Sequence, residues 1–241
     1  MLSKKLLRAG SRFHLSPSVD SDSNDVILAL PLNSSFGISD VSSIIRGSGN
    51  SYGIEADNAT LDTSVQKFYG SSINAGAPSG SIRLRTATGF QAFFSNNFCI
   101  EGWMYVPSIG TDNLAIFYHH AGTDAGFQLM ILGSNTSYSR QLYFSGGGGG
   151  NITRGADRIP LAQWFHFACT RDSQTVRLFI NGVSSLDGGG STNANYTYSD
   201  KSNFLVSLNS TYNNVRVQDL RVYRTTAKYT SNFTPPGAMF T

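Results

Sequence analysis

Charged residues are scarce in this sequence, and positive and negative charges nearly cancel. Asp, Glu, Lys and Arg make up 14% of the 241 residues and leave a formal net charge of +3. A charge this small, scattered beyond the first residues, excludes the broad basic surface that nucleic-acid binding requires. Only two glutamates occur, Glu55 and Glu101. This strong helix former is thus almost missing, whereas the turn formers glycine, serine, threonine and asparagine are frequent.

Cysteine is rare and long apolar runs are missing. The two cysteines, Cys99 and Cys169, each lie in an expected strand, and their spacing fits no metal site. We expect both to be free thiols that pack as small apolar groups. No run is long enough to cross a membrane, and residues 1–17 lack the apolar stretch of roughly 7 to 15 residues that a secretory signal requires. We therefore expect no membrane partner and no export signal.

The clearest structural signal is the stretch LAQWFHFACTRDSQTVRLFINGVS, from Leu161 to Ser184. WFHFACT is largely apolar on both faces of an expected strand, which predicts a central place in a sheet. RDSQ predicts a turn, and TVRLFI resumes the alternation of a strand. Asn181-Gly182 tolerates the positive backbone angles of a two-residue hairpin turn, so the chain should reverse there. One face of the first strand should carry Phe165, Phe167 and Cys169, and one face of the second should carry Val176, Leu178 and Ile180.

Shorter strand patterns occupy much of the remaining chain, and residues 36–64 are polar and glycine-bearing with no expected element. The pattern predicts an all-β antiparallel protein. The further expected strands are DVILALPLN, VQKFY, SIRLR, NNFCIEGWMYVP, LAIFY, FQLMILG, RQLYFS, FLVSLN and VRVQDLRVYR.

The first 25 residues differ in composition from the rest. They begin with basic residues and continue with the polar run SPSVDSDSND, which predicts a flexible arm over residues 1–25 and a separate domain over residues 26–241. Two interpretations remain open: the arm packs against its own domain, or it docks on a neighbouring subunit of an assembly. The residues expected to anchor it are Lys4, Lys5, Arg8, Arg12 and Phe13.

Three stretches together carry a family resemblance: NFCIEGWMYV, WFHFACTRDSQTVRLFING and DLRVYRTTAKYTSNFTPP. As a set they resemble a laminin-G-like domain of the concanavalin A-like lectin and glucanase superfamily, over roughly residues 25–236. The closing YTSNFTPP resembles domains found in structural proteins of tailed bacteriophages. The resemblance implies a jelly-roll sandwich of two antiparallel sheets, one of them concave. It implies no activity, because this fold hosts lectins, hydrolases and adhesion modules.

A glycosidase of this superfamily would need two carboxylates on one strand face, about 5 Å apart. The related glucanases carry them in an ExDxE-type run, which this chain lacks. Glu101 has no second acid within five residues on either side. We therefore interpret Glu101 as structural, bonded to backbone or to a strand neighbour such as His166. The protein is expected to be no enzyme and to have no catalytic residues.

Two weaker kinds of site remain as hypotheses. Many laminin-G-like domains bind calcium through rim oxygens, and the matching candidates are Asp112, Asn113 and Asp124; otherwise no cofactor is expected. Aromatic rings in polar loops could stack on sugars beside amide side chains. The residues of this glycan-binding hypothesis are Tyr118, Tyr196, Tyr198, Tyr212, Asn213 and Asn214.

These observations favour a non-enzymatic structural protein of a virion, either decorating the capsid or forming part of a tail or fibre. Its arm would contact other virion subunits, and its lectin-like sandwich would face outward and bind cell-surface polysaccharide. Because the chain has no internal repeat, avidity would require several copies or a homo-oligomer. The alternative is a free or secreted carbohydrate-binding lectin or adhesion module. A secreted hydrolase is disfavoured by the missing acids.

Overall fold

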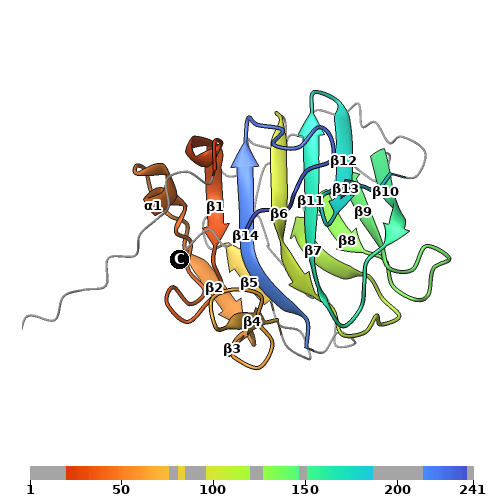
Figure 1. Cartoon of the computed structure of the whole chain (residues 1–241), viewed down its shortest axis with the longest axis horizontal. Coiled ribbons are helices and arrows are strands. Elements are labelled where there is room, and N and C mark those ends of the chain that lie inside the picture. The colour runs from red at the N-terminus through yellow and green to blue at the C-terminus, as the bar shows by residue number, and fades with distance from the viewer. Residues whose placement is uncertain are drawn as a thin grey trace, which may run out of the picture.

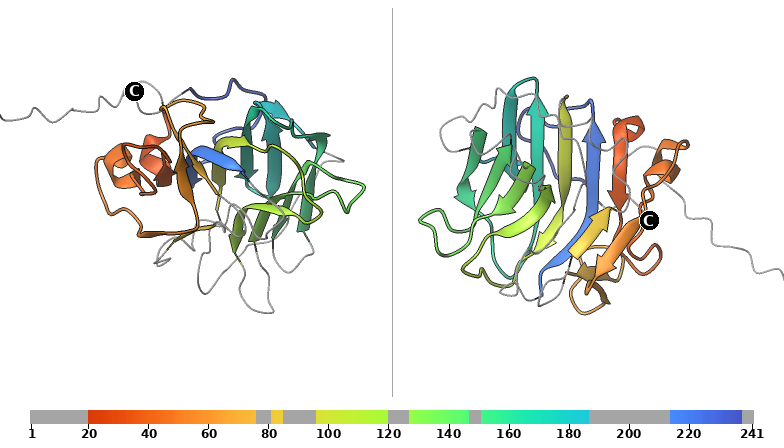
Figure 2. Two further views of the ribbon diagram at one scale, coloured as in Figure 1. Left: turned by 90° about the horizontal axis from the view of Figure 1, so that it is seen from below. Right: turned by 180° about the vertical axis from the view of Figure 1, so that it is seen from behind.

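The computed structural model of the chain describes residues 20–75, 81–84, 96–119, 127–146, 151–186 and 214–237. Its strands form antiparallel sheets, and a four-stranded sheet lies against one face of an eight-stranded one (Figures 1 and 2). The larger sheet runs in the order β13-β12-β11-β6-β14-β4-β3, with β1 also beside β14, and the smaller in the order β10-β9-β8-β7. The two-sheet antiparallel sandwich expected from the sequence is confirmed.

The elements have the following bounds. The eight-stranded sheet contains β1 (Val26–Leu30), β3 (Thr60–Asp62), β4 (Ser72–Asn74), β6 (Phe98–Tyr105), β11 (Trp164–Asp172), β12 (Thr175–Ile180), β13 (Val183–Ser184) and β14 (Arg216–Arg224). The four-stranded sheet contains β7 (Leu114–His119), β8 (Phe127–Ile131), β9 (Gln141–Gly146) and β10 (Asn151–Arg158). The remaining elements are β2 (Ile54–Asp57) and β5 (Ser81–Leu84), which pair with each other, the 3-10 turn η1 (Ser23–Asp25) and the helix α1 (Ser42–Arg46).

The hydrophobic core fills the space between the two large sheets. Alternate residues of β6 and β11 point into it and meet the apolar faces of β8 and β9. Phe98 and Phe144, one from each sheet, bring their ring centroids to 6.1 Å. Two of the predicted strand faces belong to this core, namely the face of β11 with Phe165, Phe167 and Cys169 and the face of β12 with Val176, Leu178 and Ile180.

The predicted hairpin and the central strand are both confirmed. β11 lies between β12 and β6, inside the sheet. Asn181 and Gly182 have φ angles of 51° and 76°, as a two-residue turn between right-twisted strands requires. Both cysteines are free and buried, as expected. Cys169 pairs with Ile100 on the core side, whereas Cys99 belongs to a cluster on the opposite face, so the two thiols point away from each other.

Residues 36–64 hold elements that the sequence did not indicate, namely α1, β2 and β3. Asp40 organises the first part of this segment: its carboxylate accepts hydrogen bonds from the backbone N–H groups of Ala29, Ser42 and Tyr52 at 2.9, 2.9 and 2.7 Å. These contacts join distant parts of the chain and leave no periodic pattern in the sequence. The prediction of a plain loop was therefore wrong.

VQKFY was predicted as a strand and is irregular instead. The side-chain oxygen of Gln218 accepts the backbone N–H groups of Lys67 and Phe68 at 3.0 and 2.8 Å, so a side chain takes the place of a partner strand. The predicted strand FLVSLN lies outside the described residues. No helix in the described part of the chain is long and apolar enough to span a membrane.

Replacing Gly182 by alanine should destabilise the protein more than the same change at Gly47. Both residues have positive φ, 76° and 68°, which costs an alanine about 1–2 kcal/mol. A Cβ at Gly182 would also lie 1.9 Å from the carbonyl oxygen of Phe233, whereas one at Gly47 would meet nothing within 4 Å. Urea unfolding of both variants measures the difference. Equal losses would show that the contact with Phe233 does not restrain the hairpin.

Candidate functional site

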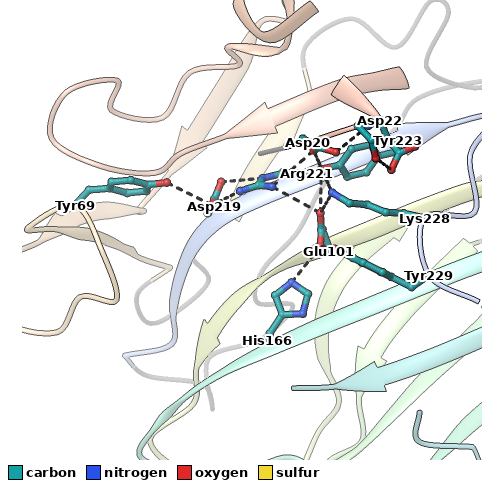
Figure 3. A network of polar contacts seen from close by, with 11 residues as sticks. Asp20, Asp22, Tyr69, Glu101, His166, Asp219, Arg221, Tyr223, Lys228 and Tyr229 are labelled. Atoms are coloured by element: carbon teal, nitrogen blue, oxygen red, sulfur yellow. Dashed lines mark hydrogen bonds and ion pairs between the residues drawn. The ribbon is translucent and has the colours of Figure 1, made fainter. Parts of the chain in front are cut away.

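Charged and tyrosine side chains form a cluster on the outward face of the eight-stranded sheet, away from the core (Figure 3). Side chains alternate along a strand, so Glu101 of β6 points away from the core that its neighbour Ile100 enters. The register sets Arg221 of β14 beside it. We call this cluster the Glu101 network; its members are Asp20, Glu101, His166, Asp219, Arg221, Tyr223, Lys228 and Tyr229.

Both carboxylate oxygens of Glu101 are occupied. Oε1 accepts the Tyr223 hydroxyl and the Lys228 ammonium, each at 2.9 Å. Oε2 accepts the Tyr229 hydroxyl at 2.7 Å and lies 3.2 Å from Nε2 of His166. The predicted contact between Glu101 and His166 is confirmed. The sequence pattern did not reveal the other partners, because Lys228 and Tyr229 lie more than one hundred residues further along the chain.

A bulge in β14 supplies the second half of the network. The pairing of β14 with β6 shifts between Gln218 and Arg221, and Asp219 has a positive φ of 53°. Nε of Arg221 donates to Oδ1 of Asp219 at 3.0 Å, and the same guanidinium lies 3.8 Å from Glu101. Oδ2 of Asp20 accepts the Lys228 ammonium at 3.0 Å. Two cations thus lie among three carboxylates.

The electrostatics of the network keep Glu101 ionised. Burial alone would raise the pKa of Glu101, but Lys228 and His166 hold that pKa well below its usual value. Burial raises the pKa values of Tyr223 and Tyr229, so both hydroxyls remain protonated donors. Only 1% of the Glu101 side chain is exposed. An ionised and enclosed carboxylate cannot be the proton donor of a glycosidase, which needs a raised pKa and contact with substrate.

The network instead fastens two distant segments to the sheet. Lys228 and Tyr229 lie in the segment after β14, which crosses in front of β6 and β11 (Figure 1). The rings of Tyr229 and Phe233 are stacked with centroids 3.4 Å apart, and Phe233 packs edge-on against Phe179 of β12 at 5.3 Å. The backbone N–H of Phe233 donates to Gly182 at 2.9 Å. YTSNFTPP is therefore a packed strap across the sheet.

The described end of the predicted arm also belongs to this face. Asp20 is part of the Glu101 network, and Asp25 accepts the Thr225 hydroxyl at 3.0 Å. Residues 20–25 thus pack on the sandwich. The predicted anchor residues lie outside the described residues: Lys4, Lys5, Arg8, Arg12 and Phe13.

A different surface lies on the outward face of the four-stranded sheet. Its residues pair across strands in rows, with Tyr118 beside Gln128 and Tyr143 beside Arg154. These four side chains are partly exposed, and Tyr138, in the loop before β9, is 42% exposed. We call this surface the tyrosine face, defined by Tyr118, Gln128, Tyr138, Tyr143 and Arg154. It offers aromatic rings beside hydrogen-bonding groups, which is what sugar recognition requires.

The glycan candidates do not form one site among the described residues. Tyr118 lies on the tyrosine face. Asn214 precedes β14 in the other sheet, where its side-chain oxygen accepts Asn74 at 3.2 Å. Sequence reasoning missed Tyr143, although its alternation with core residues in RQLYFS was the signal that could have found it. Outside the described residues lie Tyr196, Tyr198, Tyr212 and Asn213.

The calcium hypothesis gains no further ligands from the structure. Asp112 is exposed, and the side-chain oxygen of Asn113 accepts the backbone N–H of Gly133 at 3.0 Å. Asp124 lies outside the described residues. Within the described ranges, no three His, Cys, Asp or Glu side chains form a group that could hold a metal ion. Calcium binding stays a prediction.

The sequence model of the concanavalin A-like lectin/glucanase superfamily, Laminin_G_3, matches residues 74–228. The chain belongs to this family. No curated protein matches the sequence.

Among solved structures, the chain is similar to domain 4 of AbnA, an extracellular arabinanase from Geobacillus stearothermophilus, in complex with arabinotriose. The TM-score is 0.62 at 16% identity, over 89% of this chain and 96% of that one. It is also similar to the binding domain of botulinum neurotoxin serotype C1, with a TM-score of 0.62 at 12% identity, over 84% of this chain and 49% of that one. For Trypanosoma rangeli sialidase in complex with sialic acid, the TM-score is 0.58 at 15% identity, over 84% of this chain and 31% of that one. The chain thus spans about half or less of the neurotoxin and sialidase chains, and these likenesses show a shared lectin-like fold.

Replacing Glu101 by glutamine should make the free energy of unfolding depend less on pH in the acidic range. Because folding lowers the pKa of Glu101, its ionised form stabilises the fold above the unfolded-state pKa of about 4.3, and this contribution is lost as pH falls through the folded value. The variant should be about 3 kcal/mol less stable at pH 7 and should lose less stability on acidification. Urea unfolding between neutral and acidic pH measures both quantities.

Asp172→Asn is the matched control, because Asp172 is 41% exposed and lies 4.0 Å from its partner Arg177. It should change both quantities little. A Glu101→Gln profile parallel to that of the unmodified protein would contradict the assignment.

Proposed function

We propose that this protein is a non-enzymatic glycan-binding module whose binding surface is the tyrosine face. The observation that carries the proposal is the pairing of Tyr143 with Arg154, and of Tyr118 with Gln128, on partly exposed neighbouring strands. Tyrosine rings supply flat apolar surfaces for the C–H faces of sugars, and the amide and guanidinium supply hydrogen bonds to hydroxyl groups. The similar domain of AbnA, whose structure contains arabinotriose, supports a carbohydrate as the ligand class.

The acids needed for glycoside hydrolysis are missing from the paired rows of this face. The rows of described residues are Tyr118–Gln128–Ser145 and Ala115–Met130–Tyr143–Arg154, without Asp or Glu. Hydrolysis generally needs two carboxylates flanking one bond. Glu101, which belongs to the other sheet, is enclosed and held ionised. Binding without cleavage is the function that these side chains support.

We further propose that the module is displayed in several copies on a virion, as a capsid decoration or a tail or fibre component. The resemblance of YTSNFTPP to tailed-phage structural domains supports this context. The geometry is compatible with it, because Asp20, where the described chain begins, lies on the outward face of the eight-stranded sheet. The tyrosine face belongs to the other sheet. Other virion subunits could thus hold one side while the opposite side binds cell-surface polysaccharide.

Tyr143→Ala should weaken glycan binding about tenfold, because a stacking surface is lost. The ligand is first identified on a glycan array, and its affinity is then measured by isothermal titration calorimetry. Tyr105→Ala is the matched control, since Tyr105 is partly exposed on the eight-stranded sheet, where it packs against Trp164 with centroids 6.0 Å apart.

Unchanged binding is expected for the Tyr105 control. Loss of binding in the Tyr105 variant alone would place the site on the other sheet. An array on which the unmodified protein retains no glycan would refute the proposed function.

Deleting residues 1–19 should leave the sandwich folded and abolish incorporation into the particle. The cut must retain Asp20, because its carboxylate accepts Tyr223 and Lys228 at 2.5 and 3.0 Å. The variant that lacks residues 1–20 should enter the particle no better than the variant that lacks residues 1–19. It should also unfold at a lower urea concentration. Co-purification with particles and urea unfolding measure the two effects. Normal incorporation of the shorter deletion would show that the arm is not the anchor and would favour a free lectin.

A further inference from the structure

The Glu101 network holds an amine in contact with two carboxylates. Nζ of Lys228 donates to Oδ2 of Asp20 at 3.0 Å and to Oε1 of Glu101 at 2.9 Å (Figure 3). The Tyr223 hydroxyl donates to Oδ2 of Asp20 at 2.5 Å and lies 2.8 Å from the same nitrogen. The network therefore brings together a nucleophile, an acyl carbon and a neighbouring proton acceptor, which are the groups that an amide condensation requires.

The amine lies close to the position from which it could attack Asp20. A C–O bond of about 1.2 Å places Nζ of Lys228 at most about 4.2 Å from Cγ of Asp20. Reacting atoms held about 3–3.5 Å apart gain an effective concentration far above that of free groups in solution. The ammonium is also held 4.2 Å from the centroid of the Tyr223 ring, which restricts its position. A small movement of one side chain brings the two atoms together.

The surroundings favour an amide over an ion pair. The side chains of Asp20 and Lys228 are only 6% and 11% exposed, so most of the water that stabilises separate charges is excluded. Holding two opposite charges out of water is costly even when they are paired, whereas an amide carries no net charge. The remaining exposure lets the released water molecule leave.

The condensation balances without an oxidant or a cofactor. Burial alone would lower the pKa of Lys228, but Glu101 and Asp20 raise that pKa, so the amine rests in its protonated form. The first step is therefore transfer of one ammonium proton to Oδ2 of Asp20. The free amine then attacks Cγ of Asp20. Because free amine is scarce, the reaction is a slow event that occurs once in each chain.

The ionised Glu101 carries the second proton. Its carboxylate takes this proton from the attacking nitrogen and passes it to Oδ2 of Asp20, which leaves as water. One C–N bond forms, one C–O bond breaks, and Glu101 returns to its starting state. The Arg221 guanidinium lies 3.8 Å from Glu101, so this carboxylate keeps a cationic neighbour after Lys228 has reacted.

We propose that Lys228 and Asp20 form an intramolecular isopeptide bond and that Glu101 is its proton carrier. The bond joins the first described residue to the segment that follows β14. Neither segment can then separate from the sheet unless a covalent bond breaks. This inference does not depend on glycan binding.

The test is the intact mass of the full-length protein, sampled over several days at neutral pH. The bond lowers the mass by one water molecule. Trypsin does not cleave after an acylated lysine, so the digest should contain a branched peptide that joins residues 13–46 to residues 225–241. A branch to residues 86–140, which contain Glu101, would overturn the choice of Asp20. An unchanged mass without any branched peptide would overturn the proposal.

Variants separate the covalent bond from the ion pair. Lys228→Arg keeps the charge but supplies no amine that can lose its proton, so it should lose no water and should unfold at a lower urea concentration. Glu101→Gln should lose most of the branched peptide. Asp22→Ala is the matched control, because the Asp22 carboxylate accepts the Ser21 hydroxyl at 3.3 Å. It should form the bond fully.

Each variant decides a different point. Loss of water from Lys228→Arg would show that the mass change arises elsewhere and would overturn the bond. Full bond formation in Glu101→Gln would overturn the role of Glu101 as proton carrier. If Glu101→Gln does not fold, the mass and the branched peptide of the unmodified protein still decide whether the bond exists.

Discussion

The buried carboxylate of Glu101 is the constraint on which this structure depends most. A charge out of contact with water is costly unless cations and hydrogen-bond donors surround it. Here the donors come from β14 and from the segment that follows it, while Asp20 shares the Lys228 ammonium. The contacts that pair the buried carboxylate of Glu101 therefore hold the start of the described chain and its final segment on the same sheet.

This fastening gives the two sides of the sandwich different properties. On the eight-stranded sheet, the network and the stacked rings of Tyr229 and Phe233 cover part of the outward surface. On the four-stranded sheet, Tyr118 and Tyr143 remain partly exposed. The polar cluster that most resembles a catalytic centre is therefore structural, and the tyrosine face is the surface that we propose for recognition.

Family membership agrees with this division of roles. The lectin-like sandwich is shared with proteins that are enzymes and with proteins that are binding domains, so the fold alone assigns no chemistry. The side chains carry that information. Glu101 is held ionised and enclosed, whereas Arg154 is stacked on an exposed tyrosine. These environments are the basis for proposing recognition without catalysis.

Sequence alone determined the strands with strong alternation, the Asn181-Gly182 hairpin and the central place of β11, because side-chain periodicity and turn preferences are local properties. It also indicated that Glu101 is structural. Tertiary structure alone decided what surrounds Glu101, because Asp20 and Lys228 come from distant parts of the chain. The elements organised by Asp40 and the neighbourhood of Tyr143 and Arg154 were likewise unpredictable, since strand register and long-range contacts leave no periodic pattern in the chain.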